Sequence, residues 1–551
     1  MSDVIFYNGR VITMDDRLGE VTAVAVTGSQ ITAAGSDHDV LALQNERTRL
    51  IDLGGRALLP GFNDSHLHLI GYALTSEKVD LRRCSGIDDI EETIQNFIRA
   101  KNLAKGQWVL GWGWDQRLFS EQRLPTRDNL DRAAPGHPVA IMRTCCHVLS
   151  ANTAALKEAG IDRAAVFVEG GEVDVDARGV PTGVLKEKAM ELVTGLQPPL
   201  NKEKMKALIK SAGADFLAAG LTSVQTDDLS SVGGDFASLL IEVYRELEAA
   251  GELPLRVNLQ VLLPEVDQLR SFLDRSYRTG QRGDYFTIGP LKLLTDGSIG
   301  GHTALVSAPY EDRTETCGVS VLARGEVEEL VNLATGRGMQ CAVHAIGDAA
   351  VKMVLEIYQE VARHYPRPDP RFRLIHASMS NPRIIDRFEK QEVIADIQPS
   401  FIPSDYVLVD RHLGPKRAAW TYRWKDFIDR GIKLAGGSDC PVENYEPLEG
   451  IHAAVTRQDR NGNPPGGWNP DQRLNLDEAL YIYTMGSAYC TYEENDKGSI
   501  SAGKLADLVV LSEDIKAVDP SKIADLKVDL TVVGGKIVYR RKSGEETAGN
   551  S

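Results

Sequence analysis

The sequence lacks most features that would direct a chain to a membrane, a nucleic acid or an oxidising compartment. Its 7 cysteines among 551 residues include no C-x-x-C pair and no framework spacing, so we expect free thiols. No apolar run approaches the length that spans a bilayer. A formal net charge of −16 argues against nucleic acids and anionic membranes as partners, since both are bound by clustered Lys and Arg.

The beginning of the sequence, MSDVIFYNGRVITMDD, also lacks the long apolar core of a signal peptide. Together with the free thiols, this predicts a cytoplasmic protein. With 42% hydrophobic and 25% charged residues, the composition is that of a globular chain. The length allows one large domain with insertions, or two to three domains.

Short β-strands are predicted at both ends of the chain. The segments DVIFYNGRVITM and VTAVAVTGSQITAAG alternate in polarity, with Asn8-Gly9 as a turn signal. Near the other end, KLADLVVLSED and VDLTVVGGKIVYRRK have a similar length and alternation. We therefore predict that residues 1–55 and 498–543 together form one small β-sandwich.

The middle of the chain alternates β-branched runs with helical stretches, which is typical of parallel βα units. Eight candidate strands lie at residues 56–66, 221–226, 255–263, 286–296, 339–345, 372–378, 392–399 and 432–439. Eight units predict a closed (β/α)8 barrel of the TIM type, an α/β fold, over residues 56–71 and 216–497. The first two strands are too far apart for one connecting helix, so residues 72–215 are predicted to form an inserted subdomain.

A pair of histidines ends the first predicted barrel strand, in the segment LLPGFNDSHLHLIG. Residues i and i+2 of a strand point to the same face, so His66 and His68 can aim two imidazoles at one point. A metal ion requires such an arrangement. Two polar residues at the solvent edge of a strand also fit so short a pattern, and the pair alone does not decide between them.

Further residues with metal-binding side chains lie on other predicted strands. In a barrel of this kind, reactive side chains sit at the carboxyl ends of the strands. Strand four carries Lys292, strand five ends in His344, strand six in His376 and strand eight in Asp439. Burying the Lys292 ammonium among apolar neighbours costs several kcal/mol unless it is paired or chemically altered. Each of these residues alone is often structural, but the whole set predicts a metal centre.

With these residues in this order, the sequence resembles the amidohydrolase superfamily of metal-dependent hydrolases. More narrowly, it resembles the YtcJ-like branch, amidohydrolase family 3, which includes N-substituted formamide deformylases. The segments that carry the resemblance are LLPGFNDSHLHL, LKLLTDGSIGGHTALVSAPY, AVHAIGDAA, IHAS, AGGSDCPV and GSISAGKLADLVVL. They follow one another in the family's order and extend over nearly the whole chain.

The resemblance implies a centre with two divalent metal ions. The implied ligands are His66, His68, Lys292, His344, His376 and Asp439. The H-x-H pair and the aspartate would hold one ion, the other two histidines the second, and a carbamylated lysine would bridge them. Zinc suits such nitrogen and oxygen ligands. Asp439 would be the general base in the hydrolysis of a C–N amide bond in a small N-acyl, N-formyl or cyclic amide.

Two other functions are compatible with the sequence. A deaminase of the same fold would release ammonia from an amidine-type carbon. Nucleobase deaminases of the superfamily typically use one metal and lack the lysine of strand four, so Lys292 counts against this alternative. The second alternative, a non-catalytic regulatory or scaffold barrel, is disfavoured by the complete ligand set.

Five more residues are candidates for substrate contact. Asp296 and His302 follow the fourth predicted strand in a glycine-rich loop, which is otherwise an ordinary βα-loop. Trp112 and Trp114, in GWGWDQ, offer an aromatic wall or else pack the inserted subdomain. His147 resembles a histidine that the family carries in this subdomain, and otherwise caps a helix. By analogy with the fold, a homodimer is expected.

Overall fold

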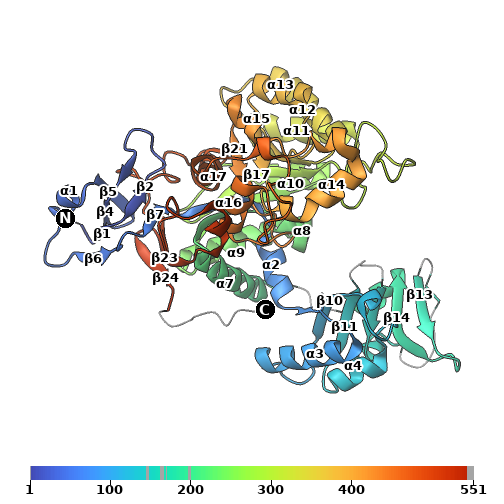
Figure 1. Cartoon of the computed structure of the whole chain (residues 1–551). Coiled ribbons are helices and arrows are strands. Elements are labelled where there is room, and N and C mark those ends of the chain that lie inside the picture. The colour runs from blue at the N-terminus through green and yellow to red at the C-terminus, as the bar shows by residue number, and fades with distance from the viewer. Residues whose placement is uncertain (1, 144–147, 162–166, 169–170, 197–199, 543–551) are drawn as a thin grey trace. The chain divides into compact units, whose positions relative to one another are not determined.

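The computed structural model forms two compact units, each described here by itself (Figure 1). The described residues are 2–143, 148–161, 167–168, 171–196 and 200–542. The first unit comprises Met1–Gly71 and Lys202–Ser551, and the second comprises Tyr72–Asn201. The helix α7 (Lys202–Ala218) thus lies in the first unit, although the predicted insertion runs to residue 215. It is held there through its last turn, where the Thr531 hydroxyl donates to the carbonyl of Leu217 at 2.6 Å.

Two sheets of the first unit form a β-sandwich. The four-stranded sheet runs in the order β5 (Gln30–Gly35), β4 (Ala23–Thr27), β1 (Val4–Tyr7) and β6 (Arg49–Asp52). The six-stranded sheet runs in the order β24 (Lys536–Arg540), β23 (Val528–Val533), β22 (Leu508–Leu511), β7 (Ala57–Pro60), β2 (Arg10–Ile12) and β3 (Glu20–Val21). Phe6 and Val24 share one core cluster with Leu58 and Val510, so both sheets and both ends of the chain contribute to it.

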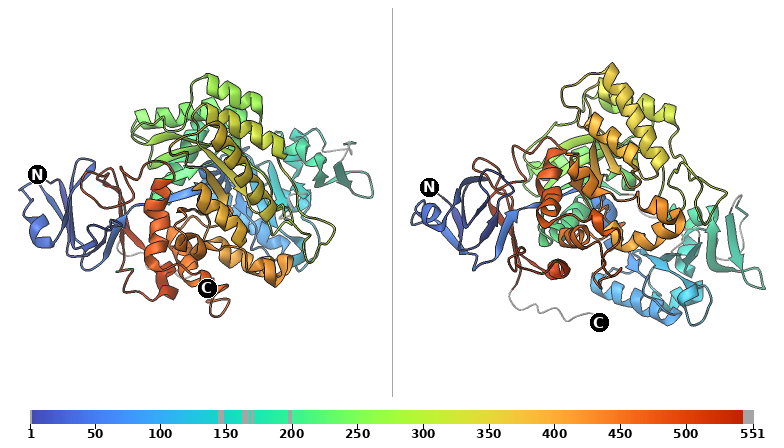
Figure 2. Two further views of the ribbon diagram at one scale, coloured as in Figure 1. Left: turned by 90° about the horizontal axis from the view of Figure 1, so that it is seen from above. Right: turned by 45° about the horizontal axis from the view of Figure 1, so that its top comes forward.

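The same unit contains a nearly closed barrel of eight parallel strands, which confirms the predicted fold class. The strand order is β21 (Leu434–Gly436), β20 (Ile394–Ile397), β19 (Arg373–His376), β18 (Cys341–Ala345), β17 (Phe286–Leu294), β16 (Arg256–Leu262), β15 (Leu221–Thr226) and β8 (Phe62–Leu67). Helices surround these strands (Figure 2).

The helices between barrel strands β15 and β21 are α8 (Leu229–Val232), α9 (Ala237–Ala249), α10 (Val266–Asp274), α11 (Arg324–Gly336), α12 (Asp348–His364), α13 (Pro382–Gln391), α14 (Phe401–Ala418) and α15 (Trp424–Asp429). The other helices near this unit are α1 (Asp37–Leu41), α2 (Leu69–Ser76), α16 (Pro447–Thr456), α17 (Leu476–Tyr481) and α18 (Ser487–Tyr489). Amphipathic sequences explain the outer ring: α12, for example, buries Val351, Val354 and Tyr358 along one face.

The seam between the first and last barrel strands closes at their carboxyl ends. The backbone N–H of Asp439 donates to the carbonyl of His66 at 2.8 Å, and the N–H of His68 donates to the carbonyl of Cys440 at 2.8 Å. Gly437 permits this approach, because a Cβ there would lie 2.7 Å from the backbone nitrogen of His66. The barrel therefore closes through the predicted metal ligands themselves.

The first predicted strand, residues 56–66, is wrong as a single element. The chain instead forms β7 in the sandwich and β8 in the barrel, with Gly61 between them. β7 pairs with β2 and β22, whereas β8 pairs with β15. The chain changes sheets at Gly61, where it passes so close to β15 that a Cβ would lie 2.2 Å from Thr222.

The second unit is built on a mixed six-stranded sheet. Its order is β13 (Gly171–Val175), β14 (Pro181–Glu187), β12 (Val148–Ala151), β11 (Val139–Arg143), β10 (Val109–Trp114) and β9 (Val79–Asp80). Its helices are α3 (Ile87–Lys101), α4 (Arg127–Ala133), α5 (Thr153–Glu158) and α6 (Glu191–Thr194). Ile90 and Ile94 of α3 lie in one core cluster with Trp114 of the sheet.

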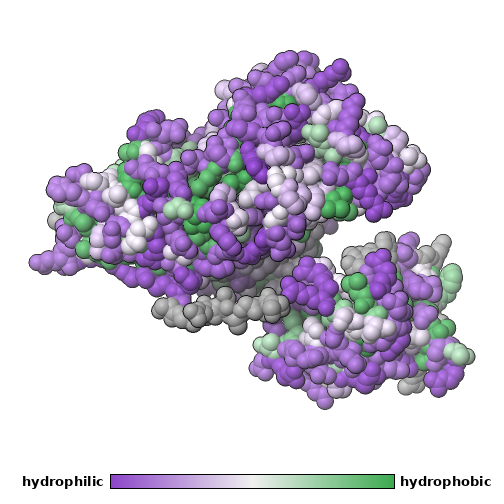
Figure 3. All heavy atoms as spheres, viewed as in Figure 1, coloured by the Kyte–Doolittle hydropathy of each residue, from purple (hydrophilic) through white to green (hydrophobic). Residues whose placement is uncertain are grey.

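The surface of each unit is largely polar on the face shown in Figure 3. Hydrophilic residues cover most of that face, and hydrophobic residues gather only in small groups. Among the residues that the structure describes, no helix combines the length and the apolar character needed to cross a membrane.

The sheet change at Gly61 leads to a prediction for stability. We expect Gly61→Ala to lower the free energy of unfolding by about 1–3 kcal/mol, because the added methyl group overpacks against Thr222. Gly325→Ala in α11 is the matched control, since nothing lies within 4 Å of its added Cβ and alanine favours the helix. Urea unfolding of both variants measures the difference, and equal midpoints would contradict the close approach.

Candidate metal centre

Four of the predicted ligands meet at the carboxyl end of the barrel. Nε2 of His66 and Nε2 of His68 lie 3.3 and 3.1 Å from the same oxygen, Oδ1 of Asp439. Nζ of Lys292 lies 3.0 Å from Nε2 of His66. The donor atoms of the two histidines and the aspartate all fall within 4.8 Å of one another, a spacing that one metal ion can span.

The other two histidines continue this cluster along the barrel rim. The ring centroids of His376 and His66 are 5.8 Å apart, and those of His344 and His376 are 4.5 Å apart. The two lie outside the tight group of His66, His68 and Asp439. The structure thus brings the predicted ligands to one end of the barrel, as a tight group with a pair of histidines beside it.

Two of the histidines, His66 and His376, each donate a ring N–H to the side-chain amide oxygen of a glutamine. Nδ1 of His66 donates to Oε1 of Gln260 at 2.8 Å, and Nδ1 of His376 donates to Oε1 of Gln398 at 2.7 Å. Each bond fixes the ring and its tautomer, so Nε2 is left without a proton and can coordinate a metal ion.

Oxygen acceptors orient the other two histidines. Nδ1 of His68 donates to the carbonyl of Asp227 at 2.9 Å and lies 2.8 Å from the hydroxyl of Ser230. Nε2 of His344 donates to the carbonyl of Gly297 at 3.2 Å, so that Nδ1 is the ring nitrogen available to a metal ion. All four imidazoles are therefore held in the way that metal-binding histidines usually are.

Burial and mutual charge shift the pKa values of this cluster. Burial lowers the pKa of Lys292, and burial together with the nearby lysine lowers the pKa of His66 to about 3. Burial would also lower the pKa of His68, but the hydrogen bond to Asp439 raises it to about 9. Burial would raise the pKa of Asp439, but its bonds to the two histidines hold that pKa well below the usual range. Burial therefore disfavours the charged form of Lys292, which lies near an ionised Asp439.

A known protein family matches most of the sequence. Residues 49–539 match the amidohydrolase family. The chain belongs to the amidohydrolase family.

This amidohydrolase has relatives that match along almost its full length. It is 35% identical over 538 residues to the putative amidohydrolase YtcJ of Bacillus subtilis, covering 98% of this chain and 99% of that protein. It is 28% identical over 554 residues to N-substituted formamide deformylase of Arthrobacter pascens, covering 98% and 99%. The crystal structure of an uncharacterised metal-dependent hydrolase from Pyrococcus furiosus matches with a TM-score of 0.75 and 28% identity, covering 94% of this chain and 100% of that one.

The donor set of this amidohydrolase fits divalent metal ions. Four oriented imidazoles, one carboxylate and one buried amine converge, and imidazole and carboxylate are ligands that zinc accepts. Family membership supports the assignment of this protein as a metal-dependent hydrolase. The cluster of His66, His68 and Asp439 is its candidate metal group.

Two of the ligands have left-handed backbone conformations. The φ angles of Asp439 and His376 are 58° and 73°. Non-glycine residues adopt this conformation at a cost of about 1–3 kcal/mol, and it persists where the surroundings impose it. In Asp439 the seam hydrogen bond to His66 supplies that constraint, so the strain aims the carboxylate at the histidines.

Asp296 holds the backbone segments next to His344 in place. Its buried carboxylate accepts from the backbone N–H groups of Leu305 and Gly347 at 2.8 Å and of Ile346 at 3.0 Å. Its Oδ1 lies 3.4 Å from Nε2 of His344. With its oxygens occupied in this way, Asp296 ties the loop after β17 to the end of β18 and positions His344. This placement favours a positioning role over the predicted substrate contact.

The structure describes three of the other four residues predicted to contact substrate. His302 pairs with Asp312 at 3.0 Å in a separate cluster. In the second unit, Trp114 is fully buried and its indole N–H donates to the carbonyl of Ile141 at 3.1 Å, which is a packing role. The guanidinium of Arg82 lies 4.7 Å above the ring of Trp112. His147 lies outside the described residues.

Sequence reasoning missed the residues that hold the ligands. Gln260 and Gln398 are visible as polar positions within the apolar runs NLQVLL and ADIQPS, a signal that could have found them. Glu443 was also missed. It accepts from the Ser404 hydroxyl at 2.5 Å, and burial raises its pKa to about 7, four residues beyond the ligand Asp439.

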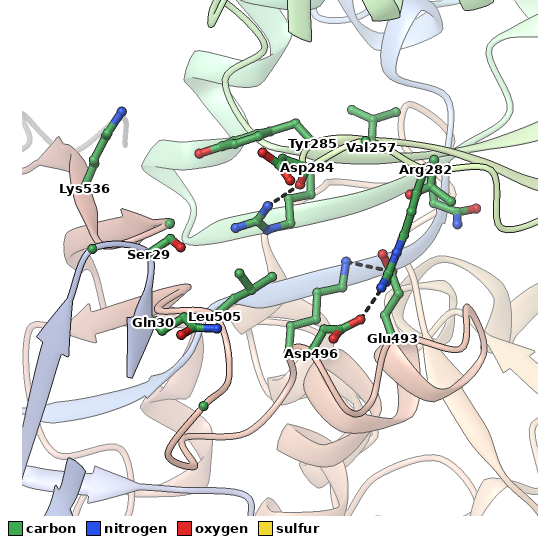
Figure 4. A pocket seen from close by; sticks show the side chains of 18 residues that line it. Ser29, Gln30, Val257, Arg282, Asp284, Tyr285, Glu493, Asp496, Leu505 and Lys536 are labelled. Carbon is green, nitrogen blue, oxygen red and sulfur yellow. Dashed lines mark hydrogen bonds and ion pairs between the residues drawn. The ribbon is translucent and has the colours of Figure 1, made fainter. Parts of the chain in front are cut away.

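A cavity of about 560 Å³ lies at the opposite, amino end of the barrel strands, next to the sandwich (Figure 4). Arg282 pairs with Asp496 at 2.6 Å, and Lys497 pairs with Glu493 at 2.9 Å. Its lining includes none of the predicted ligands, and these charges are paired with one another. The predicted ligands thus lie at the other end of the barrel from this cavity.

The glutamine acceptors lead to a prediction for metal affinity. We expect Gln260→Leu to weaken zinc binding roughly 10–100-fold, because His66 loses the acceptor that fixes its ring. Gln225→Leu is the matched control: this glutamine is equally buried in the neighbouring strand but bonds to Ser487. Competition with a chromophoric chelator measures both affinities. An equal loss in the two variants would show that general destabilisation, not ring orientation, is responsible.

Proposed function

We propose that this protein hydrolyses the C–N amide bond of a small N-acyl, N-formyl or cyclic amide. The observation that carries the proposal is the buried Lys292, which lies 3.0 Å from a candidate ligand at the end of the barrel where all six predicted ligands gather. The relationship to N-substituted formamide deformylase of Arthrobacter pascens supports the C–N bond as the bond cleaved.

Two zinc ions fit the six side chains. His66, His68 and Asp439 would hold one ion, and His344 with His376 would hold the other. Burial favours the neutral form of Lys292, and that form can attack CO2 and lose a proton. The resulting carbamate would supply an anion to both ions. When bound, the two ions supply Lewis acidity at the scissile carbonyl and lower the pKa of the attacking water.

Asp439 is proposed as the general base. Its low pKa keeps the carboxylate ionised, so that it can accept a proton. It takes a proton from the attacking water and delivers it to the leaving nitrogen, which departs as an amine. The left-handed backbone and the seam hydrogen bond hold the carboxylate in place for both transfers.

The principal alternative is a deaminase on the same scaffold. It would use the same base against an amidine-type carbon and release ammonia, whereas amide hydrolysis releases an amine and a carboxylic acid or formate. The buried Lys292 favours the amide hydrolase, because a single-metal centre has no use for a bridging anion. A purely regulatory barrel would not require any of the oriented imidazoles.

Metal content tests the bridge. We expect Lys292→Ala to bind at least one equivalent of zinc fewer than the wild type, because the two ions of the centre lose their shared anion. With 13C-labelled bicarbonate, a carbamate carbon signal is expected in the wild type and not in Lys292→Ala. Lys497→Ala, which removes another buried lysine at the amino end, should keep both ions.

The zinc content distinguishes the amide hydrolase, the deaminase and the regulatory barrel. A zinc content that Lys292→Ala leaves unchanged would contradict the bridge and favour the deaminase. No zinc in any of these proteins would contradict both enzymes.

The products test the bond and the base. A panel of N-formyl amines, N-acyl amides and cyclic amides is assayed for acid and amine release, with aminated heterocycles assayed in parallel for ammonia. We expect turnover in the amide panel, and a fall in kcat of roughly 10²–10⁴-fold in Asp439→Asn, because the amide cannot take the proton. Turnover confined to the aminated heterocycles would contradict the proposal.

A further inference from the structure

A second group of metal-binding side chains lies away from the catalytic centre. His302, Asp312 and His412 place one donor atom each within 4.8 Å of one another. Nε2 of His302 lies 3.0 Å from Oδ1 of Asp312, and Nδ1 of His412 lies 2.7 Å from Oδ2. Among the described residues, this is one of two such groups, and the other is the catalytic cluster.

Two segments that are distant in the sequence supply these ligands. His302 and Asp312 lie in the connection between β17 and α11, and His412 lies in α14. The backbone of His302 is left-handed, with φ of 55°, and its ring packs edge-on against Tyr310. The backbone N–H of Glu311 donates to the carbonyl of His412 at 2.8 Å, so the two segments are already held in register.

We propose that His302, Asp312 and His412 bind a third divalent ion, of the zinc type, outside the catalytic centre. Two imidazole nitrogens and one carboxylate form a ligand set that suits zinc, with a fourth position open to water. The side chains of His302, Asp312 and His412 are 14%, 22% and 5% exposed, so the group is partly enclosed yet reachable by an ion.

The competing explanation is that the three side chains only form hydrogen bonds with one another. One carboxylate can accept an N–H from each ring, and Arg411 lies 3.4 Å from the same carboxylate. That arginine is 71% exposed, however, and can turn into solvent. The two rings are only 3.9 Å apart between centroids, a spacing at which both can reach one cation.

A bound ion would stabilise the two segments that contact His344 and His376. Phe401, the first residue of α14, stacks on His376 with centroids 5.7 Å apart. The carbonyl of Gly297, in the other segment, accepts from His344. An ion shared by His302, Asp312 and His412 would therefore tie together the two segments that flank the second pair of catalytic histidines. The inference does not depend on which bond the centre cleaves.

Zinc stoichiometry of the full-length protein tests this site. Protein stripped with chelator is titrated with zinc against a competing dye that masks weak sites. We expect Asp312→Asn and His302→Gln to bind one equivalent fewer than the wild type. In the Lys292→Ala background, where the catalytic centre is impaired, the same substitutions should again remove one equivalent. His364→Gln, which alters an exposed histidine of α12, should remove none.

Thermal unfolding with and without zinc separates an ion site from a hydrogen-bonded clip. Zinc should raise the midpoint of Lys292→Ala, and adding Asp312→Asn should reduce that rise. If both near-isosteric variants keep the full wild-type stoichiometry, the proposal is overturned, even if their midpoints fall. Folding is monitored by circular dichroism, and His302→Gln serves if Asp312→Asn does not fold.

Discussion

The hydrogen bonds that close the barrel seam are the constraint on which the catalytic end depends. The bond from the Asp439 N–H to the His66 carbonyl joins the last barrel strand to the first and places the carboxylate beside both histidines. Beneath it, the buried carboxylate of Asp64 accepts from the backbone N–H of Ser438 at 3.0 Å. Barrel closure and ligand geometry therefore rest on the same few contacts, and a wider seam would separate the ligands.

The choice of acceptors around the centre bears on its charge. Gln260 and Gln398 hold their histidines with neutral amides, whereas a carboxylate in the same place would donate electron density to the ring. The buried Arg373 and Asp396 pair with each other deeper in the barrel. The carboxylates in contact with the histidines are thus Asp439, beside His66 and His68, and Asp296, beside His344.

Sequence patterns were sufficient for features that repeat along the chain. The alternation of β-branched runs with helical stretches predicted the barrel strands. The ends of those strands predicted the candidate ligands, because parallel strands gather their carboxyl ends at one rim. The division at Gly61 could not be predicted, because the apolar run is continuous and only the approach of Thr222 separates the two sheets. His412 could not be recognised either, because it lies within a helix far from the loop of His302 and follows no strand-end pattern. The burial of Trp114 likewise depends on partners from distant segments.

The continuity of β7 and β8 has a consequence for how the chain matures on the ribosome. β7 lies between β2, made early, and β22, which is among the last strands to be synthesised. Until β22 has been synthesised, the edge of β7 that pairs with it has no partner. The sheet that holds β7 can therefore be completed only after the barrel strands, which precede β22 in the sequence, have been made.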